Sequence, residues 1–124
     1  MKIERRSQTR YDIRAEVRVA KEEVIYDMKV ENISRSGAFV SAADLKHHSW
    51  VTPGKELQIA LFATEELDNI QLKGLIVRVA ELNSPRAFGF GVAFTYAEPG
   101  ARAKLHQLVD LAAQQSVHPP PQNR

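Results

Sequence analysis

The chain has 124 residues, of which 44% are hydrophobic and 26% are charged, and it carries a formal net charge of +2 with no cysteine. This balance predicts one soluble globular domain that is large enough to bury a core. Disulfides and thiolate metal sites are excluded, and no apolar run has the length of a membrane span or the position of a signal peptide. We therefore expect a cytoplasmic protein.

Residues 1–10 are rich in arginine and show no hydrophobic periodicity, which predicts a flexible basic N-terminal arm. A guanidinium group binds phosphate or guanine through paired hydrogen bonds and stacks on purines. The arm therefore favours recognition of phosphate and guanine, with a solubilising basic tail as the alternative.

Two strand-like segments follow the arm. From Tyr11, and again from Val24, side chains alternate between apolar and polar, which is typical of half-buried β-strands joined in a hairpin. The second segment ends in Asn32-Ile33-Ser34-Arg35-Ser36-Gly37, whose short polar side chains and glycine predict a turn. Apolar residues return around 38–42 as a short third strand. The turn thus lies at the rim of a sheet, where loops commonly carry function.

Two further strands are predicted after a connection over residues 43–54. Apolar residues at alternate positions mark residues 57–61 as one strand and residues 69–82 as a longer one. Alternation places Arg78 on the mainly apolar side of the longer strand. The middle of that strand, Leu75 to Val79, has apolar residues on both sides, so we expect it to be covered on both faces.

One face of the last strand, which starts at residue 87, carries Phe88, Phe90 and Phe94. These rings are either the core of a barrel or a platform on which bases stack, and we favour the core. The other face carries small residues, Gly89 and Gly91 among them, and allows a helix or another backbone to approach closely.

A C-terminal helix is predicted from Glu98-Pro99-Gly100, because proline suits the first helical turn. Four apolar residues then recur at helical spacing and form one stripe: Ala101, Leu105, Leu108 and Ala112. We expect this stripe to pack on the barrel, with the glycine-rich face of the last strand as a candidate surface, and residues 116–124 to form a disordered tail. Residues 11–115 are thus predicted to be mainly β, a six-stranded antiparallel barrel with a C-terminal α-helix.

Two motifs, Arg6-x-x-x-Arg10 and Asn32-x-Ser34-x-x-Gly37, resemble in order and spacing those of the PilZ domain family. PilZ domains are bacterial receptors for the second messenger cyclic di-GMP and have a β-barrel fold. The resemblance extends over roughly residues 5–113 by strand pattern and agrees with the fold predicted from the residues. It implies cyclic di-GMP as the ligand and no cofactor.

The resemblance also assigns the ligand-binding residues. It makes Arg6 and Arg10 the motif arginines, which bind guanine and phosphate. Asn32 and Ser34 match the polar positions that contact guanine. Gly37 matches a position where a Cβ would distort the turn or crowd the ligand.

Arg5 and Arg35, next to motif positions, are additional candidate ligand contacts. Asn32 stands where the family more often has aspartate, and an amide offers guanine fewer and weaker acceptors than a carboxylate does. A turn that only ends a strand is the alternative explanation for Asn32 and Ser34.

Together these residues predict a non-enzymatic, single-domain receptor that acts as an adaptor. Binding of one cyclic di-GMP molecule or an intercalated pair would order the arm and change the surface presented to a downstream protein. Two alternatives stay open. One is a degenerate PilZ module that binds only protein, and the other is a small barrel that binds nucleic acid through its basic arm.

The other side-chain clusters give weaker evidence for a functional site. His47 and His48 are adjacent and would point apart, so no metal site is expected. The sequence has no nucleophile elbow and no phosphate-cradling glycine loop. Trp50 is either a lid over the core or an exposed contact.

Overall fold

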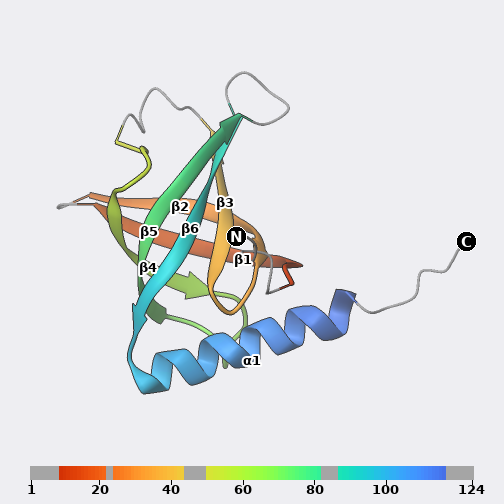
Figure 1. Ribbon diagram of the computed structural model, residues 1–124. Helices are drawn as coiled ribbons and strands as arrows, with labels where there is room; N and C mark the ends of the chain where they lie inside the picture. Colours follow the sequence, from red (N-terminus) through yellow and green to blue (C-terminus); the bar gives the residue numbers. More distant parts are fainter. Residues whose placement is uncertain (1–8, 22–23, 44–49, 82–86, 117–124) are drawn as a thin grey trace, which may run out of the picture.

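The computed structural model describes residues 9–21, 24–43, 50–81 and 87–116. The elements are β1 (Tyr11–Lys21), β2 (Val24–Ile33), β3 (Gly37–Ala43), β4 (Glu56–Phe62), β5 (Ile70–Glu81), β6 (Ala87–Ala97) and α1 (Pro99–Ser116). The strands close into an antiparallel barrel in the order β1-β2-β3-β6-β5-β4, with α1 across one end (Figure 1). The predicted fold class is confirmed. Within the described residues, no helix combines the length and the apolar character needed to cross a membrane.

Alternation along the strands fills the barrel, because every second side chain points inward. In β1, Val17 and Val19 are fully buried, whereas Arg18 between them is exposed. In β6, Phe88 and Phe90 are buried, with ring centroids 6.3 Å apart. The aromatic face of β6 is therefore the barrel core, as favoured from the sequence, and not a base-stacking platform.

Helix α1 lies against β1, β5 and β6 and closes the lower end of the barrel in Figure 1. Most of its predicted stripe is buried, namely Leu105, Leu108 and Ala112. The stripe packs on the barrel, as predicted, but the glycine-rich face of β6 is not the surface that it covers. A Cβ at Gly89 would instead meet the Phe39 ring, and one at Gly91 would meet Arg78, because side chains of neighbouring strands cover that face. The helix includes Ser116, and residues 117–124 of the predicted tail lie outside the described residues.

A β-bulge in β5 turns Arg78 outward. The pairing with β6 shifts between Ile76 and Arg78, so that Val77 is an extra residue in β5. Two expectations are therefore wrong: Arg78 is not on the apolar side, and the segment is not covered on both faces. Val77 is 50% exposed and Val79 is 37% exposed. A bulge displaces the alternation by one residue, which inverts the side chains that follow it.

Trp50 packs against the edge of the core. Its ring centroid lies 5.0 Å from that of Tyr26 with an angle of 40° between the ring planes, and its side chain is half-buried against the core cluster. Tilted aromatic pairs of this kind contribute about 0.5–1.5 kcal/mol beyond the area they bury. The structure thus supports the interpretation of Trp50 as a lid.

Gly74 in β5 lies in a closely packed part of the core. A Cβ there would lie 2.4 Å from Val92 Cγ1 and 3.0 Å from Ile59 Cδ1. We predict that Gly74→Ala forces these side chains apart and lowers the free energy of unfolding by about 1–3 kcal/mol. The matched control is Gly100→Ala, because a Cβ on this helical residue meets nothing within 4 Å. Chemical denaturation followed by Trp50 fluorescence measures both, and equal stability of the two variants would contradict the packing.

Candidate ligand-binding site

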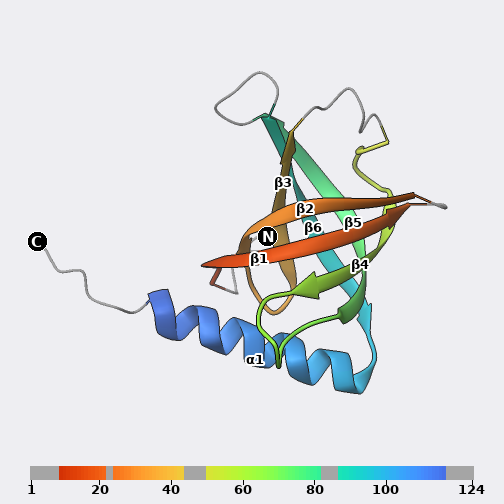
Figure 2. The same ribbon diagram turned by 180° about the vertical axis from the view of Figure 1, so that it is seen from behind.

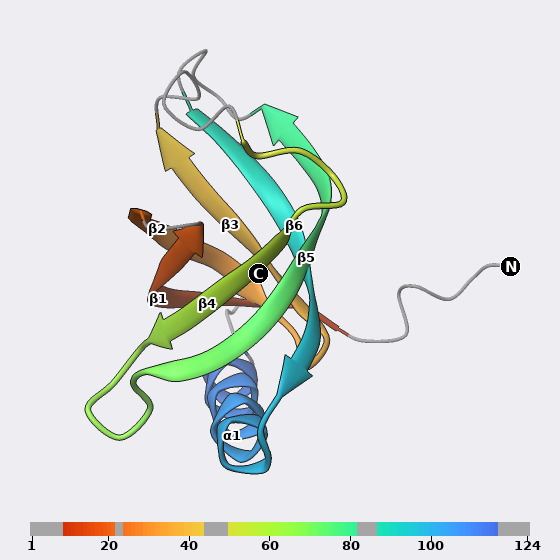
Figure 3. The same ribbon diagram turned by 90° about the vertical axis from the view of Figure 1, so that its left-hand side faces the viewer.

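The two sequence motifs meet at one end of the barrel. The antiparallel pairing sets Tyr11 opposite Ile33, so the start of β1 lies beside the β2–β3 connection (Figure 3). Arg10 Nη1 donates a hydrogen bond to Asn32 Oδ1 at 3.2 Å. Two residues that are 22 positions apart in the sequence, one from each motif, are thereby in contact.

A second β-bulge turns Asn32 toward solvent. The pairing of β2 with β3 shifts between Val30 and Asn32. Strict alternation from buried Val30 would point Asn32 into the core, whereas after the bulge Ile33 is buried and Asn32 is half-buried at the outer face. This irregularity makes the Asn32 amide available to a ligand.

Ser34 holds the turn together. Its side chain is 2% exposed, and its N–H donates to the Gly37 carbonyl oxygen at 2.8 Å. The Ser34 hydroxyl donates to the same oxygen at 3.4 Å and accepts from the Ser36 N–H at 3.2 Å. These hydrogen bonds match the interpretation of Ser34 as a residue that stabilises the turn. A contact between Ser34 and a ligand stays a prediction.

Gly37 is required by the close approach of β6. It pairs with Ala93, and a Cβ on it would lie 2.4 Å from the Val92 carbonyl oxygen. That oxygen belongs to the barrel backbone and cannot move aside cheaply. The Phe94 N–H also donates to the Ser36 carbonyl oxygen at 2.8 Å. The turn is thus locked to β6, so a loss of binding on replacing Gly37 would not by itself identify a ligand contact.

Arg35 links the turn to α1. Its Nη2 lies 3.4 Å from Asp110 Oδ1, and the side chains are 53% and 60% exposed. Exposed ion pairs contribute only about 0–1 kcal/mol, so the guanidinium can change partners at small cost. The turn therefore contacts the helix that lies beside it in Figure 2.

Phe39 and Arg78 extend the site across the outer face of the barrel. Backbone pairing sets Asn32 beside Phe39, which in turn lies beside Gly91. Gly91 pairs with Arg78 on the next strand. Because Gly91 has no side chain, Arg78 reaches Phe39, and its guanidinium carbon lies 5.4 Å from the ring centroid. An amide, an aromatic ring and a guanidinium thus form one row on the surface.

Phe39 and Arg78 belong to neither motif, and the sequence alone did not identify them as site residues. Phe39 reads as an ordinary apolar residue of a short strand, and alternation assigns Arg78 to the buried side. The sequence did contain one indication that Arg78 faces outward, because an arginine is almost never fully buried without a partner. The position of Arg78 on an otherwise apolar face therefore indicates a shift in the register of β5.

The structure describes five of the seven predicted ligand contacts and gathers them around one turn: Arg10, Asn32, Ser34, Arg35 and Gly37. Arg5 and Arg6, like His47 and His48, lie outside the described residues. In the part of the chain that the structure describes, no three histidine or acidic side chains are grouped as a metal site would require.

Solved structures share this fold at low sequence identity. The PilZ domain of YcgR from Escherichia coli with c-di-GMP has a TM-score of 0.72 at 11% identity, over 90% of this chain and 94% of that one. The K. pneumonia MrkH–c-di-GMP complex has a TM-score of 0.73 at 16% identity, over 91% and 55%. The Bacillus subtilis inhibitor of motility, MotI/DgrA, has a TM-score of 0.69 at 20% identity, over 91% and 51%. Identities this low show a shared fold alone.

The chain spans about half the length of the MotI/DgrA and MrkH chains, 51% and 55% respectively. No curated protein matches the sequence. The family model of the PilZ domain matches residues 4–111, which is most of the chain and includes both motifs. The chain therefore belongs to the PilZ domain family.

Proposed function

We propose that this protein is a receptor for cyclic di-GMP and binds it on the outer barrel face around Arg10 and Asn32. The observation that carries the proposal is the contact between the two motifs, with the Arg10 guanidinium 3.2 Å from the Asn32 amide oxygen. The YcgR and MrkH structures, which share the fold, contain c-di-GMP and support the choice of ligand.

The site offers a suitable group to each part of cyclic di-GMP, which has two guanines and two anionic phosphates. Guanine O6 and N7 accept a bidentate guanidinium contact worth about 1–3 kcal/mol, the role that the family motif gives to Arg6 and Arg10. Asn32 Oδ1 accepts a hydrogen bond from Arg10 and would accept one from the guanine N1–H or N2–H in its place. The plane of Arg78, held over Phe39, offers a stacking surface to a purine.

Arg35 would couple the nucleotide to α1. A phosphate near the turn would compete with Asp110 for the Arg35 guanidinium, because hydrogen bonds to phosphate are stronger than an exposed ion pair at 3.4 Å. Binding would free α1 from the turn at this point and, together with a change in the N-terminal arm, would alter the surface shown to another protein. The protein would act in this way as a non-enzymatic adaptor.

Arg10→Ala is expected to lower the affinity for cyclic di-GMP by about tenfold or more, because a bidentate guanine contact is lost. Arg6→Ala should show a similar loss if the family motif holds. The matched control is Arg18→Ala, which removes an exposed arginine from β1, the strand that follows Arg10. Arg18 pairs with Asp27 at 3.4 Å and lies far from Asn32. Isothermal titration calorimetry on the wild type and the variants measures the differences.

The same titration separates the alternatives when GTP and a short oligonucleotide are included. No binding of cyclic di-GMP by the wild type at any accessible concentration would leave the PilZ fold standing and favour a module that binds only protein. Preferential binding of the oligonucleotide, weakening steeply with salt, would favour a nucleic-acid-binding barrel.

Asn32→Asp is expected to tighten binding by up to about tenfold. A carboxylate accepts two charge-assisted hydrogen bonds from guanine N1–H and N2–H, whereas the amide accepts through one oxygen. Asn32→Ala is the control and should weaken binding. If Asn32→Asp binds more weakly than the wild type, the Asn32 NH₂ group donates to the ligand and the orientation proposed for guanine is wrong.

Arg78→Lys tests whether Arg78 stacks on the nucleotide. Lysine keeps the positive charge but lacks the planar group that stacks on a purine. We expect Arg78→Lys and Arg78→Ala to weaken binding to a similar extent, roughly fivefold or more. Competition of unlabelled cyclic di-GMP against a fluorescent analogue provides the measurement. Wild-type affinity in Arg78→Lys would rule out stacking.

A further inference from the structure

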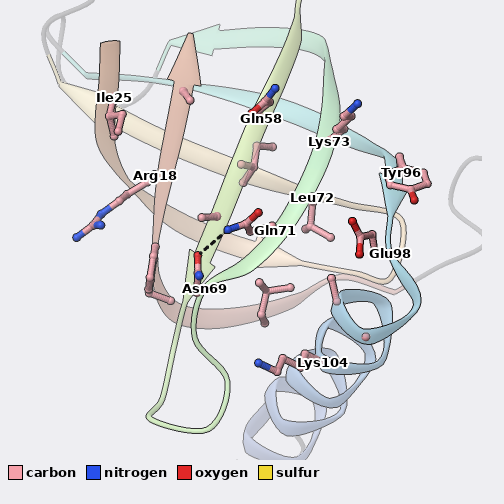
Figure 4. A pocket seen from close by; sticks show the side chains of 17 residues that line it. Arg18, Ile25, Gln58, Asn69, Gln71, Leu72, Lys73, Tyr96, Glu98 and Lys104 are labelled. Carbon is pink, nitrogen blue, oxygen red and sulfur yellow. Dashed lines mark hydrogen bonds between the residues drawn. The ribbon is translucent and has the colours of Figure 1, made fainter. Parts of the chain in front are cut away.

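A groove of about 650 Å³ lies on the barrel face formed by β1, β4 and β5, beside the start of α1 (Figure 4). In the closed strand order, β4 at the centre of this face lies across the barrel from β3, which carries Phe39. Of the predicted nucleotide contacts that the structure describes, none lines the groove. The groove is therefore separate from the proposed nucleotide site, and its volume is typical of binding sites.

Short side chains on neighbouring strands form the floor of the groove. One row of paired residues runs Arg18–Ala60–Gln71, and the next runs Ala20–Gln58–Lys73. Because alanine is short, the longer side chains around Ala20 and Ala60 stand above it and enclose a hollow. In Figure 4 the amides of Gln58 and Gln71 come from β4 and β5 on this face.

Cations and aromatic rings form the walls. The Arg18 guanidinium carbon lies 4.8 Å from the Phe62 ring centroid, and Lys73 Nζ lies 5.9 Å from that of Tyr96. Contacts of this kind hold a long side chain over a ring and reduce the entropy that it loses on binding a partner. Lys104 adds a further cation from α1 (Figure 4).

The groove carries an excess of positive charge. Its lining includes three cations, Arg18, Lys73 and Lys104, and one carboxylate, Glu98. Arg18 is paired with the exposed Asp27 at 3.4 Å. Within the described part of the chain, no carboxylate lies at ion-pair distance from Lys73 or Lys104. The two lysines can therefore meet an anionic group without first breaking an ion pair.

Exposed apolar side chains flank the charged centre. Ile25 of the β1–β2 hairpin is 66% exposed and Tyr96 is 53% exposed, and they lie at different sides of the groove in Figure 4. Exposed apolar groups beside polar ones are typical of protein-binding surfaces, and tyrosine and arginine recur among the residues that dominate binding energy. The surface thus combines cationic and apolar contacts.

We infer that this groove is the docking surface for a downstream protein, which inserts an acidic segment that also carries apolar side chains. Its carboxylates would lie toward Lys73 and Lys104, and its apolar groups toward Ile25 and Tyr96. A nucleic acid suits the groove less well, because three cations opposed by one carboxylate neutralise few phosphates. The inference extends the adaptor role proposed above but does not require nucleotide binding.

The probe is a short synthetic peptide in which glutamate alternates with leucine and phenylalanine, titrated into ¹⁵N-labelled protein and followed by NMR. Two further peptides replace every glutamate with glutamine or with lysine. The test variant is Lys73→Glu combined with Lys104→Glu, and the matched control is Lys29→Glu, which reverses an exposed lysine on β2 outside the groove. An unchanged spectrum away from the substitutions shows that each variant is folded.

We expect saturable shifts at Gln58, Gln71, Lys73 and Tyr96 with the glutamate peptide only. The double variant should weaken this binding by about tenfold or more, whereas Lys29→Glu should leave it within about twofold. Absence of saturable binding, equal binding of the lysine or glutamine peptide, or shifts confined to Arg10 and Asn32 would overturn the inference. So would an oligonucleotide that binds this groove in preference to the peptide.

The peptide titration is performed with and without cyclic di-GMP. Failure of cyclic di-GMP to bind leaves the peptide result valid, because no predicted nucleotide contact among the described residues lines the groove. Failure of the peptide to bind likewise leaves the calorimetric result valid. The two proposals can therefore fail independently.

Discussion

The antiparallel register between β1 and β2 is the constraint on which the candidate site depends. Because Tyr11 pairs with Ile33, the chain that enters β1 passes beside the chain that leaves β2, and Arg10 meets Asn32 at 3.2 Å. The register is held by buried side chains such as Val17, which pairs with Met28. A slip of one residue would turn these side chains to the outside, so the core that stabilises the barrel also positions the two motifs.

Two β-bulges determine which side chains lie on the outer face of the barrel. The bulge before Asn32 and the bulge before Arg78 each add one residue to a strand. In both places the core keeps its apolar side chain, with Ile33 and Ile76 fully buried, while the polar residue reaches the surface. A β-bulge thus allows one short segment to place an apolar side chain in the core and a polar side chain at the surface.

The turn between β2 and β3 contacts two other parts of the molecule, β6 and α1, through which the proposed ligand would influence more distant surfaces. Gly37 brings the turn against the backbone of β6, and Arg35 reaches Asp110 of α1. The contact with β6 is rigid because backbone atoms of the barrel cannot move aside at low cost. The exposed ion pair between Arg35 and Asp110, in contrast, is easily replaced by a contact with another partner. A ligand would therefore change the contact with the helix before it disturbed the barrel.

The sequence by itself determined the strands, the terminal helix and the motifs, because alternation, helical spacing and short motifs are local properties of the chain. Val17 and Val19 in β1, and Leu105 and Leu108 in α1, are buried as their spacing predicts. Only the tertiary structure decided that Asn32 and Arg78 face outward and that Phe39, rather than the helix, covers Gly89. Bulges and cross-strand contacts depend on neighbours far away in the sequence, and no local period records those neighbours.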